Sequence, residues 1–329
     1  MSPTQSSSSR GGARGAAARS GGAGPGRPSG NGRGGRPAQG RTIQARPPGR
    51  RVQSSTMAVI AVVLVVVVVL VVVLVKVTGG GSSSGANGLK PPAVTTASPA
   101  VLQEVENVPN SVLSAVGTGG SNVNPPVVQK HQPVLHLNGS SKPAALYIGG
   151  VFCPYCAATR WSLLLAFSKF GTFSGVQETT SSPWDYAPDT PTFDFLHATY
   201  SSPYVNFVPV EYLSQDKDGL DTHTVLTPLT STEQRLYSTY DNPEGVPFVD
   251  IGNLVFIKSA PIDPQLLDGK TQAQVAALLS NPSSPVTQAI VGTANYIMAG
   301  VCAIDGGQPG SVCTNSGVQA AAKALGINA

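Results

Sequence analysis

The sequence contains little charge, few aromatic side chains and few cysteines. Charged residues make up 12% of its 329 residues, aromatic residues make up 6%, and there are four cysteines. So few cysteines exclude a disulfide-dense mini-protein. The net charge of +4 is unevenly distributed: residues 1–56 hold ten arginines and no acidic residue, whereas the 253 residues after Lys76 hold 10 basic and 17 acidic side chains, a net charge of −7. This acidic main part argues against a globular nucleic-acid-binding domain.

Residues 1–56 are rich in arginine, glycine and serine and contain almost no large apolar side chain. Such a segment buries too little apolar surface to offset the entropy lost on ordering, so we predict a disordered tail. Two functions fit this composition. The tail either sets membrane topology and touches anionic lipid, which is the interpretation we favour, or binds RNA through its Arg-Gly repeats.

Residues 57–75 form an uninterrupted run of 19 apolar side chains. A helix rises about 1.5 Å per residue, so this run spans ~28 Å, close to the thickness of the hydrocarbon core of a bilayer. We therefore predict a single transmembrane helix over residues 57–77. The alternative is a cleaved signal peptide, whose apolar region is shorter and is followed by an A-x-A-like site. Because ten arginines precede the run, we predict a cytoplasmic N-terminus and an extracytoplasmic C-terminal part.

A Gly-, Ser- and Pro-rich stretch over residues 78–97 is predicted to be a flexible linker to a domain over residues 98–329. At the start of that domain, Ser98-Pro99 is typical of a helix N-terminus. Asn110 is predicted to cap a second short helix that ends at Gly117. Residues 119–133 are predicted to be a loop.

A strand and a helix are predicted on either side of the motif Cys153-Pro154-Tyr155-Cys156. Residues 145–148 form a short apolar run typical of a buried strand. Residues 157–170 contain neither glycine nor proline and repeat their apolar side chains with helical spacing, and Gly171 is predicted to end this helix. The C-x-x-C motif therefore lies where a strand passes into the N-terminus of a helix.

This position predicts different roles for the two cysteines. Free N–H groups and the macrodipole at a helix N-terminus stabilise a thiolate and lower its pKa, so Cys153 is predicted to be the attacking thiol. Cys156 lies one turn further on and is predicted to resolve the mixed disulfide that Cys153 forms. The alternatives are a permanent structural disulfide and half of a zinc site. Zinc takes four ligands, and no histidine lies at suitable spacing from the motif.

A second part of the expected site begins at Val246-Pro247. This pair opens the apolar run over residues 248–251, and a Gly252-Asn253 turn followed by another apolar run predicts a β-hairpin. In a thioredoxin-like fold, a cis proline at this place lies beside the C-x-x-C motif, and the residue before it presents its backbone to the substrate. The alternative is an ordinary trans proline at the start of a strand.

The order of the remaining predicted elements agrees with a thioredoxin-like fold of the α/β class. A strand is predicted over residues 173–180, a helix over 230–240 and another helix over 271–279. The sequence then reads strand, C-x-x-C helix, strand, helix, X-Pro hairpin, helix. Residues 181–212 exceed what this fold requires and are predicted to be an insertion with strand-like runs. Three aromatic residues of this region are candidates for a binding face: Trp184, Tyr186 and Tyr204. The alternative, which we favour, is that most of these aromatic side chains belong to the core or cover it.

The run KPAALYIGGVFCPYCAATRWSLLLAFSKFGTFSG, the segment TYSSPYVNFVPVE and the run GVPFVDIGN together resemble the DUF929 family, over roughly residues 98–328. This thioredoxin-like family of archaea and actinobacteria has no established biochemical role. The resemblance implies a thioredoxin-like fold with Cys153, Cys156 and Pro247 at redox-type positions. Pro154-Tyr155 resembles the active-site dipeptide of glutaredoxins, without any feature for binding glutathione.

The predicted strand over residues 145–148 carries no acidic residue that would accept a proton from Cys156, which argues against efficient reductase action. In the C-terminal part, residues 286–301 are predicted to form a core-facing helix that Cys302 ends, and a final helix is predicted over residues 318–325. Cys302 and Cys313 are predicted to form a structural disulfide in an oxidising compartment. The alternative is a second redox pair that relays electrons to the C-x-x-C motif. The four histidines are scattered and have no assigned role.

The sequence thus predicts a membrane-anchored, extracytoplasmic thiol–disulfide oxidoreductase that acts on protein thiols and disulfides. Cys153 and Cys156 would be catalytic, and the substrate-binding residues would be Val246, Pro247, Pro154 and Tyr155. A membrane redox partner is expected, whereas no metal, cofactor or nucleic acid is. The alternative is a non-catalytic thioredoxin-fold scaffold of the cell envelope, in which the C-x-x-C motif is a permanent disulfide.

Overall fold

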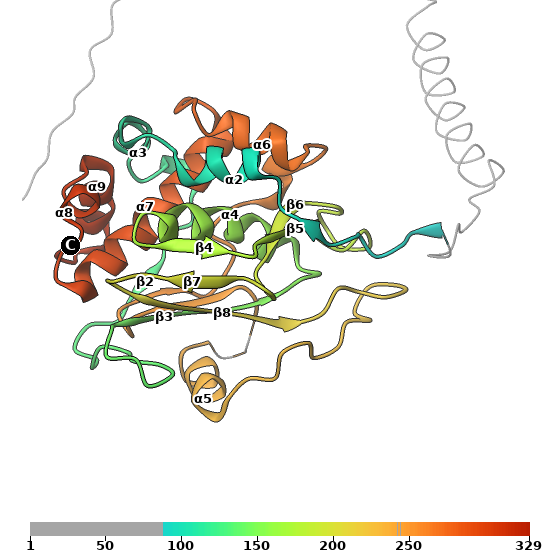
Figure 1. Cartoon of the computed structure of the whole chain (residues 1–329), viewed down its shortest axis with the longest axis horizontal. Coiled ribbons are helices and arrows are strands. Elements are labelled where there is room, and N and C mark those ends of the chain that lie inside the picture. Colours follow the sequence, from blue (N-terminus) through green and yellow to red (C-terminus); the bar gives the residue numbers. More distant parts are fainter. Residues whose placement is uncertain (1–87, 242, 244) are drawn as a thin grey trace, which may run out of the picture. The chain divides into compact units, whose positions relative to one another are not determined.

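A computed structural model of the chain describes residues 88–241, 243 and 245–329. The predicted tail over residues 1–56, the predicted transmembrane helix over 57–77 and the first ten residues of the predicted linker lie outside the described residues. Within the described part, the protein is a mixed α/β structure with three sheets, and helices cover both faces of the largest sheet (Figure 1).

The largest sheet has five strands in the order β2-β10-β9-β3-β8. These strands are β2 (Val127–Val128), β3 (Ala144–Gly150), β8 (Asn206–Leu213), β9 (Phe248–Ile251) and β10 (Val255–Ile257). β3 is an inner strand that is parallel to β8 and antiparallel to β9, and all seven of its residues are buried. β9 and β10 form the predicted hairpin, whose turn residues Gly252 and Asn253 have left-handed φ values of 67° and 58° that suit these residue types.

Alternate residues along the strands point into two separate cores. On one face the sheet packs against α4 (Pro154–Ser168) and α7 (Pro285–Asp305), and on the other it packs against α5 (Ser231–Tyr240), as Figure 1 shows. The core on the α4 side includes the sheet residues Ala145, Tyr147, Val249, Ile251 and Ile257. The core on the α5 side includes Ala144, Leu146, Ile148, Phe248 and Phe256 with Leu236 and Tyr237 of α5.

α4 is buried on almost every side. Cys153 is its N-cap residue, and 13 of its 15 residues are buried. Its C-cap is Lys169 rather than the predicted Gly171, which has no left-handed φ. Gly171 instead lies against the end of β7 (Thr199–Ser201), where a Cβ atom would be 2.3 Å from the carbonyl oxygen of Ser201. The glycine is therefore explained by close packing and not by helix capping.

α7 is long and apolar enough to cross a membrane, and within the described part of the chain no other helix is. However, 83% of its most apolar 18-residue window is buried inside the fold, as expected for the core helix that the sequence predicts here. The helix continues to Asp305, so Cys302 lies in its last turn and does not end it. Gly306, with φ of 81°, is the residue that ends α7.

The segment between α4 and β8 forms two small sheets. β4 (Thr172–Ser174) pairs with β7 (Thr199–Ser201), while β5 (Gln177–Thr180) pairs with β6 (Pro191–Asp194) and β1 (Thr95–Thr96). The prediction of one strand over residues 173–180 is therefore wrong. Gly175, with φ of 75°, separates β4 from β5. In the largest sheet, the strand that lies parallel to β3 is β8.

The N-terminal part differs from its prediction at three places. The helices α2 (Pro99–Glu106) and α3 (Asn110–Val116) are present, but the N-cap residue of α3 is Pro109 and not the predicted Asn110, which is the first residue of the helix. However, β1 lies inside the predicted linker and pairs with β5, and Ala97 is buried, so the folded part begins before Ser98. The predicted loop over residues 119–133 contains the 3₁₀ helix η2 (Gly120–Asn122) and the edge strand β2. Elements this short carry no periodic signal.

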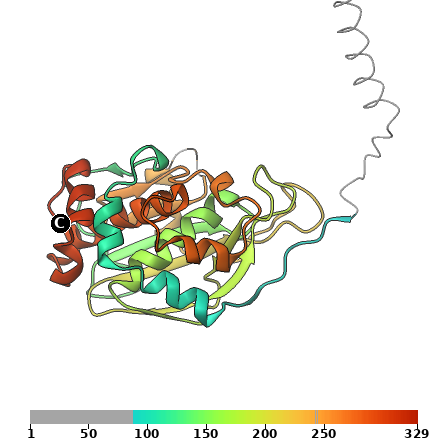
Figure 2. The same ribbon diagram turned by 90° about the horizontal axis from the view of Figure 1, so that it is seen from above.

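The remaining elements follow the hairpin: η3 (Pro264–Leu267), α6 (Gln272–Leu278), α8 (Gly310–Cys313) and α9 (Ser316–Leu325). Figure 2 shows the C-terminal helices in red beside α7. The N-terminal α3 also joins this layer, because Nδ2 of Asn295 in α7 donates hydrogen bonds to the carbonyl oxygens of Leu113 at 2.9 Å and Gly117 at 2.6 Å. The helices from both ends of the described part thus pack on the same side of the sheet.

Candidate active site

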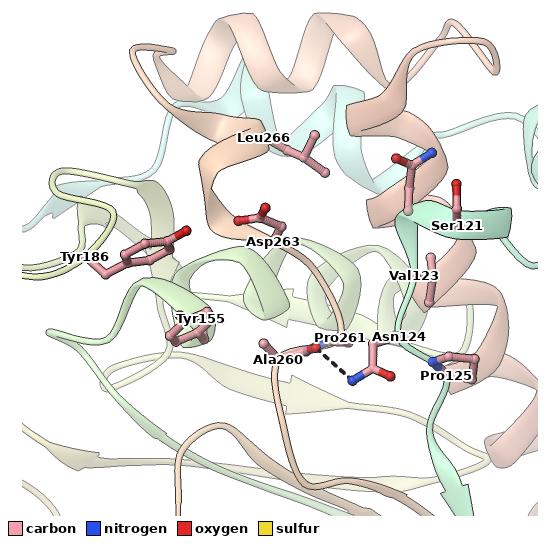
Figure 3. Close-up of a pocket in the computed structure, with 11 residues that line it drawn as sticks. Ser121, Val123, Asn124, Pro125, Tyr155, Tyr186, Ala260, Pro261, Asp263 and Leu266 are labelled. Carbon is pink, nitrogen blue, oxygen red and sulfur yellow. Dashed lines mark hydrogen bonds between the residues drawn. The ribbon is translucent and has the colours of Figure 1, made fainter.

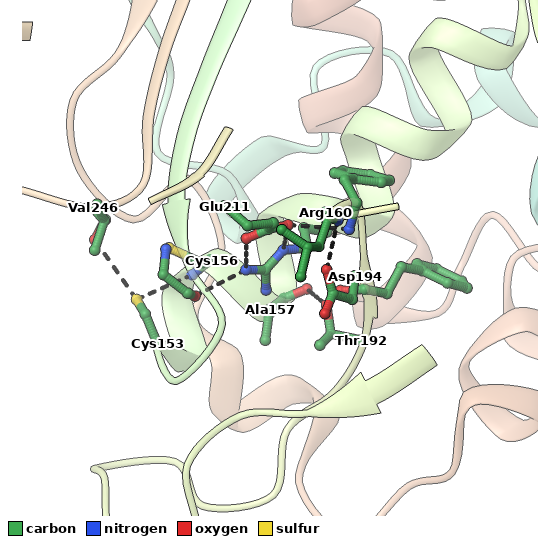
Figure 4. A network of polar contacts seen from close by, with 12 residues as sticks. Cys153, Cys156, Ala157, Arg160, Thr192, Asp194, Glu211 and Val246 are labelled. Atoms are coloured by element: carbon green, nitrogen blue, oxygen red, sulfur yellow. Dashed lines mark hydrogen bonds and ion pairs between the residues drawn. The ribbon is translucent and has the colours of Figure 1, made fainter. Parts of the chain in front are cut away.

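The C-x-x-C motif lies at the junction between β3 and α4 (Figure 4). Cys153 has extended backbone angles, and its Sγ accepts a hydrogen bond from the N–H of Cys156 at 3.3 Å. Pro154 occupies the first turn of the helix, where the missing N–H is not needed. The Cys153 thiol therefore lies among the free N–H groups that begin α4.

Both thiols are free and almost completely shielded from solvent. Cys153 retains 4% of its surface exposed and Cys156 none. The Sγ atom of Cys156 accepts a hydrogen bond from the N–H of Gly150 at 3.4 Å. Of the two cysteines, only Cys153 retains any exposed surface.

The two thiols differ in acidity. Burial by itself raises the pKa of Cys153, but hydrogen bonds from the side chain and the N–H of Cys156, together with the positive charge of Arg160, outweigh it and hold the pKa below its ordinary value. Burial raises the pKa of Cys156 well above its ordinary value, and the hydrogen bond and charge of Cys153 raise it further. The proton of the pair therefore stays on Cys156, and Cys153 is the better nucleophile.

Arg160 lies one helical turn beyond Cys156 and is fully buried. Its Nε and Nη2 donate hydrogen bonds to the two carboxylate oxygens of Glu211 at 2.9 and 2.6 Å, and Nη2 also donates to the carbonyl oxygen of Gly150 at 2.8 Å. Burial lowers the pKa of Arg160, but Glu211 outweighs this effect, so the guanidinium stays charged. Figure 4 shows Cys156, Arg160 and Glu211 side by side.

Glu211 is contributed by β8, where it lies opposite Gly149 of β3. Burial raises its pKa, and the charge of Arg160 opposes that rise. A buried acid is therefore linked to Cys156 through Arg160 and Gly150, although the strand before the motif contains none. Sequence reasoning missed both Arg160 and Glu211. The available signal was a charged residue four positions after Cys156 in an otherwise apolar helix, since a buried arginine requires a partner.

Val246 lies beside the motif although it is 93 positions after Cys153 in the sequence. The thiol of Cys153 donates to the carbonyl oxygen of Val246 at 3.7 Å. Pro247 follows it at the start of β9 and is buried, and the Val246-Pro247 peptide bond is cis. The structure thus places Val246 and Pro247 beside Cys153, while Pro154 and Tyr155 lie on the other side in the first turn of α4.

Aromatic side chains lie on both sides of the motif. The ring of Tyr155 stacks on that of Tyr186 with 6.3 Å between the ring centroids, at the end of a groove (Figure 3). On the other side, Phe152 stacks on His223 at 3.9 Å, and Nδ1 of His223 lies 3.1 Å from Oδ1 of the buried Asp216. His223, one of the four histidines without a predicted role, thus contacts the residue that precedes Cys153.

The other two aromatic candidates for a binding face make no ring contact with the motif among the described residues. Trp184 is only half-exposed, and its ring nitrogen is buried without a hydrogen-bond partner among the described residues. Tyr204 packs against the main core. Tyr186 is therefore the member of that set that contacts the motif.

Cys302 and Cys313 form a disulfide, with an S–S distance of 1.99 Å, that joins the last turn of α7 to α8. Both residues are buried. Within the part of the chain that the structure describes, no group of three or more His, Cys, Asp or Glu residues is arranged to hold a metal ion.

A sequence model of a family described as "Domain of unknown function (DUF929)" matches residues 132–303, more than half of the chain. The match contains the C-x-x-C motif, the Arg160–Glu211 pair and the hairpin after Pro247, and it includes Cys302 but not Cys313. No curated protein and no solved structure matches the chain.

Proposed function

We propose that this chain, which belongs to the DUF929 family, is a membrane-anchored, extracytoplasmic thiol–disulfide oxidoreductase that acts on protein thiols and disulfides. One observation carries the proposal. The two free cysteines at the start of α4 divide into Cys153, which has a lowered pKa and retains a small exposed surface, and Cys156, which has a raised pKa and no exposed surface. Exchange through a mixed disulfide needs such a division between an attacking and a resolving thiol.

The order of the elements supports a thioredoxin-like fold. The elements β3, α4, β8, α5, β9, β10 and α7 give the order strand, C-x-x-C helix, strand, helix, X-Pro hairpin, helix. The last helix in this order is α7, and not α6, which is the helix predicted there over residues 271–279. β3 and β8 are parallel, the hairpin is antiparallel to β3, and α5 covers the face opposite α4 and α7. The small sheets between α4 and β8 are then the insertion, and α8 and α9 are the C-terminal helical extension.

The first chemical step is attack by the Cys153 thiolate on one sulfur of a substrate disulfide. A bond forms between Cys153 and that sulfur while the substrate S–S bond breaks, and the second substrate sulfur leaves as a thiolate that takes a proton from solvent. Before the attack, the N–H of Cys156 and the first turn of α4 stabilise the negative charge on Cys153.

Cys156 carries out the second step. Once Cys153 is part of a mixed disulfide it has no negative charge, so one cause of the raised pKa of Cys156 disappears. Cys156 loses its proton, attacks Cys153 and expels the substrate sulfur as a thiolate. The substrate disulfide has gained two electrons and two protons, and the Cys153–Cys156 dithiol has lost its two electrons and become a disulfide. Oxidation of a substrate dithiol is the reverse sequence, and a dithiol or disulfide partner at the membrane returns the pair to its starting state.

Val246 is proposed to position the substrate. Its carbonyl oxygen faces the Cys153 thiol at 3.7 Å, so an extended substrate segment that pairs with this backbone would bring its sulfur to Cys153. Pro247, Pro154 and Tyr155 would form the surface around that sulfur.

The proposed location depends on the sequence before the described residues. The apolar run over residues 57–75 and the ten arginines before it predict a single span with the C-terminal domain outside. The Cys302–Cys313 disulfide agrees with an oxidising compartment.

Trapping of mixed disulfides in the native membrane tests the proposed function. In a Cys156→Ala variant the second step is blocked, so Cys153 is expected to accumulate covalent adducts with its substrates. Non-reducing gels would show these adducts as bands of higher mass, and mass spectrometry would identify the substrates. The Cys153→Ala/Cys156→Ala double variant is the control and should give no such bands.

The opposite result would favour the non-catalytic scaffold, for which the near-complete burial of both thiols is the relevant observation. In that case no adducts form, and Cys153 stays unreactive toward a maleimide after its partner is removed. The C-x-x-C motif would then be a structural feature of a binding module.

A further inference from the structure

A groove of about 610 Å³ begins at Tyr155, the residue that precedes Cys156 in the motif. Figure 3 shows Tyr155 and Tyr186 at one end of it, Ser121, Val123 and Asn124 at the other, and Asp263 between them. The groove has room for one long side chain and the backbone on either side of it. Because Tyr155 belongs to the C-x-x-C motif, a ligand bound at the tyrosine end of the groove contacts the motif.

The tyrosine end of the groove is aromatic and negatively charged. Tyr155 and Tyr186 stack with 13° between their planes, and Tyr186 retains 58% of its surface exposed. Burial, the neighbouring Tyr186 and the charges of Asp185 and Asp263 all raise the pKa of Tyr155, so both carboxylates act on this hydroxyl. Aromatic faces and carboxylates both attract cations.

The other polar groups of the groove add further acceptors. Nδ2 of Asn122 donates a hydrogen bond to Oε1 of Gln288 at 2.7 Å. Nδ2 of Asn124 donates to Oγ of Ser259 at 3.1 Å and to the carbonyl oxygen of Ala260 at 3.3 Å. Each asparagine therefore has its carbonyl oxygen to offer to a ligand. Among the described residues, no lysine, arginine or histidine lines the groove.

We propose that this groove receives a lysine or arginine side chain of the polypeptide substrate, close in sequence to the cysteine that reacts with Cys153. The inference rests on the proposed function and specifies the substrate that the same site selects. A lysine or arginine side chain has only hydrogen-bond donors at its end, which matches a lining of acceptors. Its positive charge matches Asp185 and Asp263, and its end can lie over the exposed face of Tyr186.

The test measures how fast Cys153 reacts with short cysteine peptides that carry 2-nitro-5-thiobenzoate as a mixed disulfide. In the full-length Cys156→Ala variant, Cys153 bonds to the peptide sulfur, the peptide–thiobenzoate S–S bond breaks, and the released thiobenzoate anion is followed by its absorbance. The peptides differ in one residue near the cysteine, which is Lys, Arg, Gln or Glu. We expect Lys or Arg to react about three- to tenfold faster than Gln at one of these positions, and Glu more slowly. High salt should reduce the difference.

Two substitutions remove the charge and keep the local hydrogen bonds. Oδ1 of Asp263 accepts from the N–H of Gln265 at 3.0 Å, and Oδ1 of Asp185 accepts from the N–H of Tyr186 at 2.6 Å. In each variant the asparagine retains a side-chain oxygen that accepts the same hydrogen bond. Asp263→Asn and Asp185→Asn should therefore leave the fold intact. Asp268→Asn is the matched control, because it makes the same change of charge just after η3 and outside the groove.

The Lys-to-Gln rate ratio is the decisive quantity, because it cancels any effect of the substitutions on the reactivity of Cys153 itself. We expect the ratio to fall below about twofold in the Asp185→Asn/Asp263→Asn double variant and to be retained in Asp268→Asn. Equal rates for all peptides, faster reaction of the Glu peptides, or a ratio that persists in the double variant would overturn the inference and leave the proposed function standing. If no peptide reacts above the Cys153→Ala/Cys156→Ala background, the proposed function fails and this inference fails with it.

Discussion

The two cysteine pairs of this protein lie at opposite ends of helices. Cys153 and Cys156 are free thiols at the N-terminus of α4, whereas Cys302 lies in the last turn of α7 and is bonded to Cys313 at the end of α8. All four residues are at most 4% exposed. Burial therefore does not distinguish the pair proposed to react from the pair that is bonded.

The difference lies in the charges and dipoles around the sulfur atoms. Cys153 has free N–H groups and the buried Arg160 nearby, which favour a thiolate. Cys302 lies at a helix C-terminus, where the free carbonyl groups carry negative partial charge, and this charge disfavours a thiolate. The position of a cysteine on a helix thus tells more about its chemistry than its exposure does.

The largest expected effect comes from substituting cysteines of the two pairs in turn. Cys153→Ala should lower the rate of disulfide exchange by at least about 1000-fold, because Cys156, the other thiol of the motif, is fully buried. The Cys302→Ala/Cys313→Ala double variant should change that rate by less than about twofold. Release of the thiobenzoate anion from a cysteine peptide measures both. A large loss of exchange in the second variant would instead support a redox relay between the pairs.

The second effect concerns Arg160. Arg160→Met leaves the Glu211 carboxylate buried without its partner, so the free energy of unfolding should fall by about 3–5 kcal/mol. Arg160→Met/Glu211→Leu should recover most of that loss. In both variants the pKa of Cys153 should rise, because a positive charge that lowers it is gone. Urea unfolding followed by tryptophan fluorescence and the pH dependence of alkylation at Cys153 check the two parts. An unchanged pKa would show that Arg160 is only structural.

The third effect is on stability alone. Breaking the Cys302–Cys313 bond, whose partners are separated by 11 positions in the sequence, should lower the free energy of unfolding by a little under ~3 kcal/mol in the chain-entropy model. The pH profile of Cys153 alkylation should not move, since the bond lies in the C-terminal helices. Unfolding curves of the Cys302→Ala/Cys313→Ala variant measure the first value, and a shifted alkylation profile would contradict the separation of the two pairs.

The smallest effect concerns Asp250, a buried titratable group that belongs to neither pair. Oδ1 of Asp250 accepts from the N–H of Asn253 at 2.7 Å, Oδ2 has no partner among the described residues, and burial raises the pKa from 3.8 to about 7. Between these values the folded state holds a proton that the unfolded state has lost. The free energy of unfolding should therefore decrease as the pH rises through this range.

Asp250→Asn removes this titration and keeps an acceptor for Asn253. The variant should be more stable than the natural protein above neutral pH, by about 1–3 kcal/mol, with a flatter dependence on pH. Unfolding at a series of pH values measures the slope. Equal slopes for the two proteins would show that Asp250 stays ionised in the folded state.

Local signals in the sequence were enough for the elements around the motif. The strand before Cys153, the helix after it, the Gly252-Asn253 turn and the helices after Thr230 and Thr271 are present at or within a few residues of their predicted bounds. The structure describes nothing of the predicted tail and span, so those remain predictions. Each of the elements found depends on side chains only a few positions apart, such as a cap, a proline in the first turn or an apolar repeat.

Tertiary structure decided which segments meet. It made β8, and not residues 173–180, the parallel neighbour of β3, and this pairing brings Glu211 to Arg160. It also made the groove, whose lining comes from segments near residues 122, 155, 186 and 263. An arginine in an apolar helix indicates that an acidic partner is needed, but the sequence contains several acidic residues that would meet this need equally well. The choice depends on which strand pairing buries the most apolar surface, and that is a property of the whole fold.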